Sequence, residues 1–208
     1  MPIMIDLETL AVTPDAMMLS IGACEFYYTD DTVLNSFYRR VSISKQAYAR
    51  LDPKTLAFHM RLPDDAREEM VKCLTDGIPV ADAVGEFADW MAHTKSDNGP
   101  GPMHVWSHGA TFDIPILIFH LSHNGFDPDA VFGDHRVFRD TRTLYDVAGF
   151  KEVPEGADYL TYMLAGGGTW SKRAQREGTV HHALSDAIFQ ARCVSSVYQG
   201  RRGQRLSR

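Results

Sequence analysis

The feature that most constrains the fold is the order of the predicted elements, in which strands come first and helices follow. Residues 3–7 predict a short strand, and Met17–Tyr28 carries a longer apolar run that indicates a strand partly buried on both faces. After a turn at Asp30 and Asp31, Ser36–Ile43 predicts a third strand. The connections between these segments are too short for a crossover helix, so the chain is expected to open with an antiparallel meander.

A helical period replaces this pattern further along the chain. Pro63 and Pro79 each predict a helix start, because proline is tolerated in the first turn. Two short strands, in His104–His108 and Arg136–Asp140, alternate with further helices, and Ala183–Tyr198 predicts the last helix. This order predicts an α/β fold, with a mixed central sheet that begins with the meander and is flanked by helices.

Length and composition fit one domain. The chain has 208 residues, of which 44% are hydrophobic, and this is enough to bury a sizeable core. The stretch Lys95–Met103 (KSDNGPGPM) predicts a surface loop rather than a boundary between domains. We therefore expect a single domain over residues 1–199, followed by a basic, disordered tail over residues 200–208.

Charge and cysteine content narrow the class of protein. The formal net charge of −6 argues against polyanion binding through overall basicity, so nucleic acid would have to be held locally. Cys24, Cys73 and Cys193 are far apart and form no CxxC pair, which predicts reduced, buried thiols rather than disulfides or a zinc ribbon. No apolar run approaches the roughly 18 residues of a membrane span, and no export signal is recognised. A cytoplasmic protein without membrane contact is expected.

Carboxylates recur in three separated patches of the chain, MIDLETL, SHGATFD and HHALSDA. Asp6 and Glu8 are two residues apart on the first predicted strand, so both point to one face while the apolar residues beside them point to the other. Asp113 follows a strand, and Asp186 lies on the last helix. Taken singly, each also has a structural interpretation as a solvated strand end, a helix N-cap or an exposed charge.

Together the four acids predict a metal site. Mg²⁺ and Mn²⁺ prefer oxygen ligands, and two such ions about 3.5 to 4 Å apart suit in-line displacement at phosphorus. The separations between the three patches are ones that a single domain can close. The pattern therefore predicts a two-metal site of the kind that nucleases use.

A proton acceptor is expected beside this site, and two adjacent histidines compete for the role. On a continuous helix His182 shares a face with Asp186, whereas His181 is turned away by about 140°. However, Gly178 and the β-branched residues after it indicate that the helix begins only beyond the pair, which leaves His181 on a lead-in segment able to reach a water molecule. Helix geometry favours His182, and the helix start favours His181.

These motifs, DxET on the first strand, FD after a second strand and HxxxxD opening the last helix, resemble the DEDDh superfamily of 3′-5′ exonucleases. This superfamily includes ribonuclease T, oligoribonuclease and polymerase proofreading domains, and the resemblance implies a ribonuclease H-like fold. The stretches LDPKTLAFHMRLPDDAR and WSHGATFDIPIL are similar to the phage DexA-like and bacterial exoribonuclease-like subgroup. One departure is Gly109, where many relatives have an asparagine that supplies a supporting hydrogen bond.

The resemblance implies a two-metal-ion 3′-5′ exonuclease, which hydrolyses phosphodiester bonds from the 3′ end of DNA or RNA and releases nucleoside monophosphates. Two Mg²⁺ or Mn²⁺ ions are implied as cofactors. The spacing of the last motif selects His181 as the group that accepts the proton from water. The implied metal ligands are Asp6, Glu8, Asp113 and Asp186.

Substrate contacts are also implied. Thr9 and Leu10, directly after the acidic pair, would line the pocket for the terminal nucleotide. Phe112 would stack on or contact that nucleotide, and core packing is an equally good interpretation of this residue. The implied partners are nucleic-acid 3′ ends, without a membrane, and a second copy in a homodimer.

Two other functions stay open from the sequence: an exonuclease-like module that binds nucleic acid without cleaving it, and a phosphohydrolase of small nucleotides.

Other motifs have simpler interpretations. His120 and His123 predict surface histidines rather than a zinc site, and Asp140 predicts a structural residue bonded to a neighbouring arginine. Gly166–Gly168 predict a flexible loop, because the lysine and Ser/Thr of a phosphate-binding loop are missing beside them. Candidate contacts to backbone phosphates are Lys172, Arg173 and Arg176.

Overall fold

A five-stranded mixed sheet forms the centre of the computed structural model, which describes residues 1–99, 101, 103–148, 178–179 and 181–205. The strand order is β3-β2-β1-β4-β5, and the first three strands form the predicted antiparallel meander. β4 and β5 extend the sheet parallel to β1. The strands are β1 (Ile3–Thr9), β2 (Met18–Phe26), β3 (Val33–Arg40), β4 (Val105–Ser107) and β5 (Phe138–Asp140).

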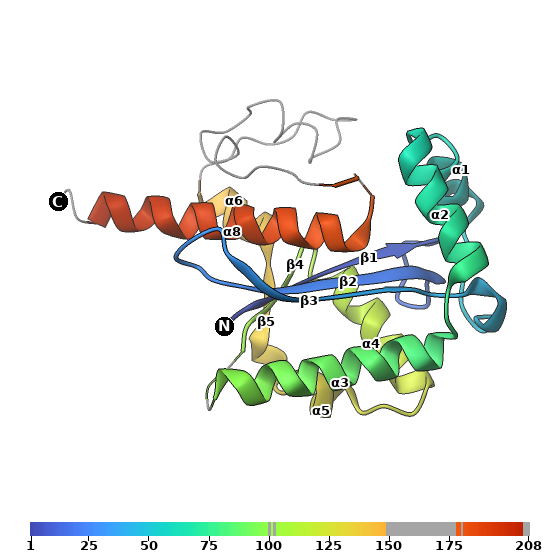
Figure 1. The fold of residues 1–208 in the computed structure, drawn as a ribbon, viewed down its shortest axis with the longest axis horizontal. Coiled ribbons are helices and arrows are strands. Elements are labelled where there is room, and N and C mark those ends of the chain that lie inside the picture. The colour runs from blue at the N-terminus through green and yellow to red at the C-terminus, as the bar shows by residue number, and fades with distance from the viewer. Residues whose placement is uncertain (100, 102, 149–177, 180, 206–208) are drawn as a thin grey trace.

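Helices cover both faces of this sheet (Figure 1). Helices α3, α4 and α5 lie below it in that view, α6 and α8 lie above it, and α1 and α2 stand beyond the end of β1. The predicted α/β architecture is therefore confirmed. The helices are α1 (Pro53–His59), α2 (Asp64–Asp76), α3 (Val80–Asn98), α4 (Asp113–His123), α5 (Pro128–Phe132), α6 (Thr141–Val147) and α8 (Ala183–Arg205), with short 3₁₀ turns at Ile43–Lys45 and His135–Val137.

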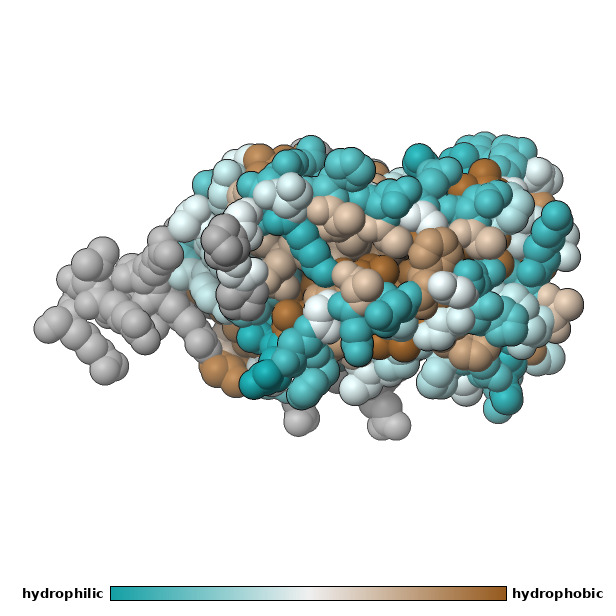
Figure 2. Space-filling view, turned by 90° about the horizontal axis from the view of Figure 1, so that it is seen from below, coloured by the Kyte–Doolittle hydropathy of each residue, from teal (hydrophilic) through white to brown (hydrophobic). Residues whose placement is uncertain are grey.

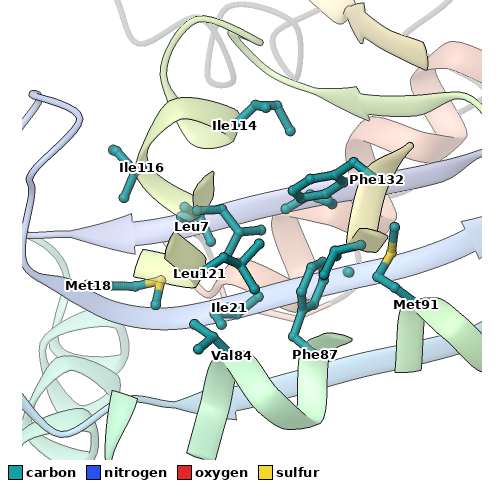
Figure 3. Packing of buried hydrophobic residues seen from close by; sticks show 14 of the residues in the cluster. Leu7, Met18, Ile21, Val84, Phe87, Met91, Ile114, Ile116, Leu121 and Phe132 are labelled. Carbon is teal, nitrogen blue, oxygen red and sulfur yellow. The ribbon is translucent and has the colours of Figure 1, made fainter. Parts of the chain in front are cut away.

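The larger core lies between the sheet and the helices below it. Leu7 and Ile21 from the sheet meet Phe87 of α3, Leu121 of α4 and Phe132 of α5, as Figure 3 shows. Each of these side chains is at most 5% exposed, so the contact removes large apolar surfaces from water. The outer face of this helix layer is mostly hydrophilic, with apolar residues gathered near its centre (Figure 2).

A second core lies on the opposite face, where α8 packs on β1 and β2. It joins Met4, Cys24 and Trp106 of the sheet to Ala187 and Val194 of α8. Small residues on the helix let it approach the strands closely. The long final helix is thereby fixed over β1, which bears two of the predicted metal ligands.

Two boundaries differ from those expected. Helix α3 continues to Asn98 and so takes up the first part of the predicted loop Lys95–Met103, because the Asn98 side chain donates to the Thr94 carbonyl oxygen and to Glu25. Helix α8 continues past Tyr198 to Arg205, so residues 200–205 are helical rather than a disordered tail. Glycine weakens a helix without ending it, and no proline interrupts this segment.

The predicted state of the cysteines is confirmed, since all three are free and buried. Among the helices of the described residues, none is both long enough and apolar enough to cross a membrane.

Candidate active site

A cavity of about 650 Å³ opens where β1 ends. Its walls come from β1, α1, the start of α4, the start of α6 and the start of α8. Ligand sites of α/β sheets commonly lie at the carboxyl ends of parallel strands, and β1, β4 and β5 all end on this side. The cavity is lined by all five residues that the sequence predicts for catalysis: Asp6, Glu8, Asp113, His181 and Asp186.

The alternation of β1 delivers the first two acids. Ile5 and Leu7 point into the lower core, whereas Asp6 and Glu8 are half-buried on the face that α8 covers. The Gln190 side chain of α8 donates a hydrogen bond of 2.8 Å to Asp6 Oδ1. One Asp6 oxygen is thus held in a fixed direction by a residue from the far end of the chain.

Asp113 begins α4 and is 2% exposed. The backbone N–H of Leu7 donates to its Oδ1 at 3.2 Å, while its Oδ2 is buried without a hydrogen-bond partner. Burial and the nearby Asp6 carboxylate raise the pKa of Asp113 well above its ordinary value of 3.8. This buried carboxylate has one oxygen without a hydrogen-bond partner and lies beside a second carboxylate. A cation would stabilise such an arrangement.

Glu8, His181 and Asp186 form a second group of possible metal ligands. Each offers one ligand atom, and these atoms lie within 4.8 Å of one another. Asp186 reaches this position because α8 begins directly against β2 at Gly22. A Cβ at Gly22 would lie 2.2 Å from the backbone of Ala183, so only glycine permits this approach.

The two adjacent histidines have different surroundings. His181 has a φ of 59°, and among the non-glycine residues that the structure describes it alone has a positive φ. It precedes the helix, lines the cavity, and meets the Phe58 ring edge-on at a centroid distance of 5.3 Å. The helical period that favoured His182 therefore does not apply to it.

His182 points away toward β3 and α2. Its ring stacks on Tyr38 at 4.3 Å between centroids, and its Nε2 lies 4.0 Å from Glu69 Oε1. Its Nδ1 accepts from the backbone N–H of Ser185 at 3.4 Å, which places it as the cap of α8. Of the two histidines, His181 is thus the one that faces the acids.

The predicted substrate contacts are only partly brought together. Thr9 and Phe112 line the cavity, although the Thr9 hydroxyl donates to the Ala11 carbonyl oxygen at 2.7 Å. Leu10 does not line it: the side chain is 2% exposed and packs with Leu19, Met70 and Cys73. The prediction for Leu10 is therefore wrong for its side chain, because the chain turns toward α2 once β1 ends.

Two other predictions need correction. His120 is fully buried rather than at the surface, and its Nε2 lies 2.8 Å from the Ala16 carbonyl oxygen. Asp140 has a structural role, but its partners are backbone N–H groups rather than an arginine side chain: it caps α6 by accepting from Arg142 and Thr143. Its Oδ2 also accepts from the Ala110 N–H at 2.7 Å. The candidates at residues 166–168 and at 172, 173 and 176 lie outside the described residues.

Several cavity residues were not predicted. Gln190 is the clearest, and its spacing of four from Asp186 on one helix is the signal that could have found it. Phe58 is 49% exposed on α1, and His59 next to it is buried with its Nε2 2.9 Å from the Thr9 carbonyl oxygen. Lys54 and Arg142 supply the permanent positive charges of the described lining.

Comparison with solved structures identifies the fold. The nuclease domain of 3′hExo, a DEDDh family member bound to rAMP, superposes with a TM-score of 0.60 and 13% identity over 95% of this chain and 91% of that one. Exonuclease I from Methylocaldum szegediense gives 0.63 and 14%, over 97% of this chain and 41% of its own. E. coli exonuclease I in complex with a dT13 oligonucleotide gives 0.63 and 14%, over 99% and 42%.

At these identities the likeness establishes the fold, and the predicted ribonuclease H-like architecture of DEDDh exonucleases is confirmed. The chain spans less than half of the length of either exonuclease I. The narrower likeness to phage DexA stays a prediction.

Comparison by sequence identifies the family. No curated protein matches the chain. The model of the 3′-5′ exoribonuclease Rv2179c-like domain, however, matches residues 1–198, nearly the whole chain, and the DEDDh neighbours agree with it in supporting a nuclease that acts at 3′ ends. This chain belongs to the 3′-5′ exoribonuclease Rv2179c-like domain family.

Proposed function

We propose that this protein is a two-metal-ion exonuclease that releases nucleoside monophosphates from the 3′ end of a nucleic-acid strand. The observation that carries the proposal is Asp113, whose Oδ2 is buried without a partner beside Asp6. An unpaired buried carboxylate costs several kcal/mol by rough estimate unless a cation meets it. The donor set, carboxylate oxygens with one imidazole, fits Mg²⁺ or Mn²⁺.

The residues proposed to hold the two ions are the four acids Asp6, Glu8, Asp113 and Asp186. Divalent ions at this position would supply charge stabilisation to both the attacking and the departing oxygen of an in-line displacement. The chain itself fixes the direction of the acids: Gln190 orients Asp6, and the Leu7 N–H orients Asp113. Pre-set ligands reduce the reorganisation that substrate binding would otherwise require.

His181 is proposed as the general base that accepts a proton from the attacking water. Its support is that one of its ring nitrogens lies within 4.8 Å of carboxylate oxygens of Glu8 and Asp186. A general base must reach the water, and a position beside the metal ligands gives that reach. Its lead-in position, outside the helix, leaves the ring able to adjust when substrate enters.

RNA is proposed as the first substrate to test. The family model is described as an exoribonuclease, and one structural neighbour recognises a histone mRNA stem-loop, while another is bound to single-stranded DNA. Val12 and Phe58, which are 68% and 49% exposed, line the cavity and offer apolar surfaces to a terminal base, next to Phe112. Stacking of this kind tolerates any base.

The proposal is tested with matched 3′-labelled RNA and DNA single strands, incubated with Mg²⁺, with Mn²⁺ and with a chelator. We expect the metal-dependent release of the labelled terminal nucleoside monophosphate, and loss of this activity in Asp6→Ala. His181→Ala should lower kcat by about 10²- to 10⁴-fold, whereas the matched control His182→Ala should leave kcat nearly unchanged. Undiminished activity of Asp6→Ala would refute the proposal.

The two alternatives give different results in the same assay. A module that only binds nucleic acid would retain the labelled strand without releasing nucleotide under any metal condition. A small-nucleotide phosphohydrolase would process dinucleotides or mononucleotides faster than longer strands. Preference for a longer strand with stepwise shortening would exclude both.

A further inference from the structure

Arg142 and the turn beneath it form a part of the cavity to which no catalytic role has been given. Arg142 lies in the first turn of α6, is exposed, and lines the cavity on the side of Asp113 and Phe112. Its positive charge acts on Asp113, whose pKa it lowers against the stronger raising effects. Within the described lining the other permanent cation is Lys54, which belongs to α1.

The guanidinium of Arg142 has a defined position over Gly109. Gly109 has a φ of 105°, a conformation that favours glycine, and a Cβ at this position would lie 3.3 Å from Arg142 Nη1 and 3.5 Å from its Cζ. The guanidinium therefore passes directly over the backbone of Gly109. A side chain on residue 109 would occupy the same space.

His108 orients the guanidinium from the other side. Arg142 Nε donates to His108 Nε2 at 3.4 Å, and His108 Nδ1 lies 2.8 Å from the hydroxyl of Thr141, which is fully buried. Among the described residues, the side-chain partner of Arg142 is thus a histidine ring rather than a carboxylate, and no acid neutralises the positive charge of the guanidinium through an ion pair.

A guanidinium that is held in a fixed position, with its charge facing a cavity, is suited to bind a phosphate group. The planar fork of arginine matches phosphate oxygens, and a strand bound for cleavage carries one negative charge at each linkage. The metal ions would neutralise the four acids. The positive charge of Arg142 therefore remains for the negative charge of the substrate. The net charge of −6 makes such local cations the means by which this protein would hold a polyanion.

We propose that Arg142, seated over Gly109 and oriented by His108, forms a subsite for one backbone phosphate of the substrate strand. This inference rests on the proposed function, because it names a residue that holds the substrate of the same cavity. Arg142 would contact substrate directly. His108 would be a positioning residue.

The test compares Arg142→Gln and Arg142→Lys with wild type. Binding of a short single-stranded RNA is measured with Ca²⁺ in place of Mg²⁺, so that binding is followed apart from cleavage. Arg142→Gln should raise Kd at least about tenfold and reduce the slope of log Kd against log salt by about 0.7, the value for one phosphate contact on a single strand. Arg142→Lys should keep the slope, because the charge remains, with a smaller rise in Kd.

Arg136→Gln is the matched control. Arg136 is also a surface arginine, but its side chain is 80% exposed, is paired with Asp134, and does not belong to the cavity lining. We expect its Kd and salt slope to equal those of wild type. Gly109→Ala should reproduce part of the Arg142→Gln effect by displacing the guanidinium, and a thermal unfolding curve checks that this variant is folded.

A set of strands with one neutral methylphosphonate linkage each locates the phosphate. One linkage should weaken binding to wild type about tenfold while adding nothing to the defect of Arg142→Gln. Unchanged Kd and salt slope in Arg142→Gln, or equal loss at every linkage, would overturn the subsite. If wild type binds in an Arg142-dependent manner but releases no nucleotide, the proposed function fails and the phosphate subsite stands. If Arg142→Gln cleaves with the wild-type KM, the phosphate subsite fails and the proposed function stands.

Discussion

Two neighbouring groups of acids differ in how their negative charges are neutralised. The cavity acids, Asp6, Glu8, Asp113 and Asp186, include an oxygen of Asp113 that has no hydrogen-bond partner. In the second group, which we call the Glu69 cluster, Glu69 accepts from both Arg40 and Tyr38, with His182 nearby. A small cavity lined by both Glu8 and Glu69 lies between the two groups.

The pKa values separate the groups in the same way. Burial raises the pKa of Glu69, but its hydrogen bonds from Arg40 and Tyr38 outweigh burial and hold that pKa below its ordinary value of 4.5. Asp113, which is more deeply buried and lies beside another carboxylate, has its pKa raised. Burial of an acid is thus not the mark of a functional site. The mark is a buried carboxylate oxygen without a hydrogen-bond partner, such as Asp113 Oδ2, because that acid gains most from a cation.

The largest effect should come from Asp113→Asn. Activity should fall by at least about 10³-fold, since a metal ligand contributes several kcal/mol of charge stabilisation. The free energy of unfolding of the metal-free protein should stay the same or rise, because the substitution removes an unpaired buried charge. Steady-state kinetics and urea unfolding measure both quantities on one preparation. A variant that loses stability together with activity would place Asp113 with the Glu69 cluster rather than apart from it.

The second prediction concerns Gln190, whose side chain donates a hydrogen bond to Asp6. Gln190→Ala should weaken metal binding by about 10- to 100-fold, as is typical when the partner of a ligand is removed. Binding is followed by calorimetric titration of Mn²⁺ into the free protein. The control is Gln199→Ala on the same helix, whose side chain donates to Asp31 at 3.4 Å at the surface. Equal metal affinity in both variants would contradict the positioning role of Gln190.

The third prediction tests the other group. Glu69→Gln should lower the free energy of unfolding by about 2 kcal/mol, because Arg40 loses its charged partner and the side chain of Glu69 is largely buried. Activity should change by no more than a few-fold. Denaturant unfolding and the 3′-end assay measure the two quantities. The expected result is opposite to that of Asp113→Asn, which should lose activity and keep its stability. A large loss of activity with unchanged stability would show that the Glu69 cluster acts in catalysis.

How much of this could be predicted from the sequence depends on the range of the interaction. The period of β1 was enough to put Asp6 and Glu8 on one face, because alternation is a local property. Helix geometry failed for His181, since the chain adopts a φ of 59° there before α8 begins. The local signal that did apply was Gly178 with the β-branched residues after it, which predicted a late helix start, and the cap at His182 agrees with that start.

Long-range contacts account for the other errors and omissions. Gln190 and Asp6 are separated by 184 positions, so their hydrogen bond depends on how closely α8 approaches the sheet. That approach is set by Gly22, an unremarkable residue inside a predicted strand. Leu10 was misassigned because its position next to the acids suggested the pocket, whereas the packing of α2 draws its side chain into the core.

The smallest effect, and the last prediction, is the pH dependence of the Glu69 cluster. A carboxyl group whose pKa is lower in the folded than in the unfolded state stabilises the fold above the unfolded pKa, and that contribution is lost as the pH falls through the folded pKa. The stability difference between wild type and Glu69→Gln should therefore be complete at neutral pH and shrink below about 4.5. It should vanish once Glu69 is protonated, because a protonated glutamate and a glutamine are similar in shape and charge. Urea unfolding of both proteins between neutral and acidic pH measures this difference, and one that stays constant over the range would mean that the charge of Glu69 does not stabilise the cluster.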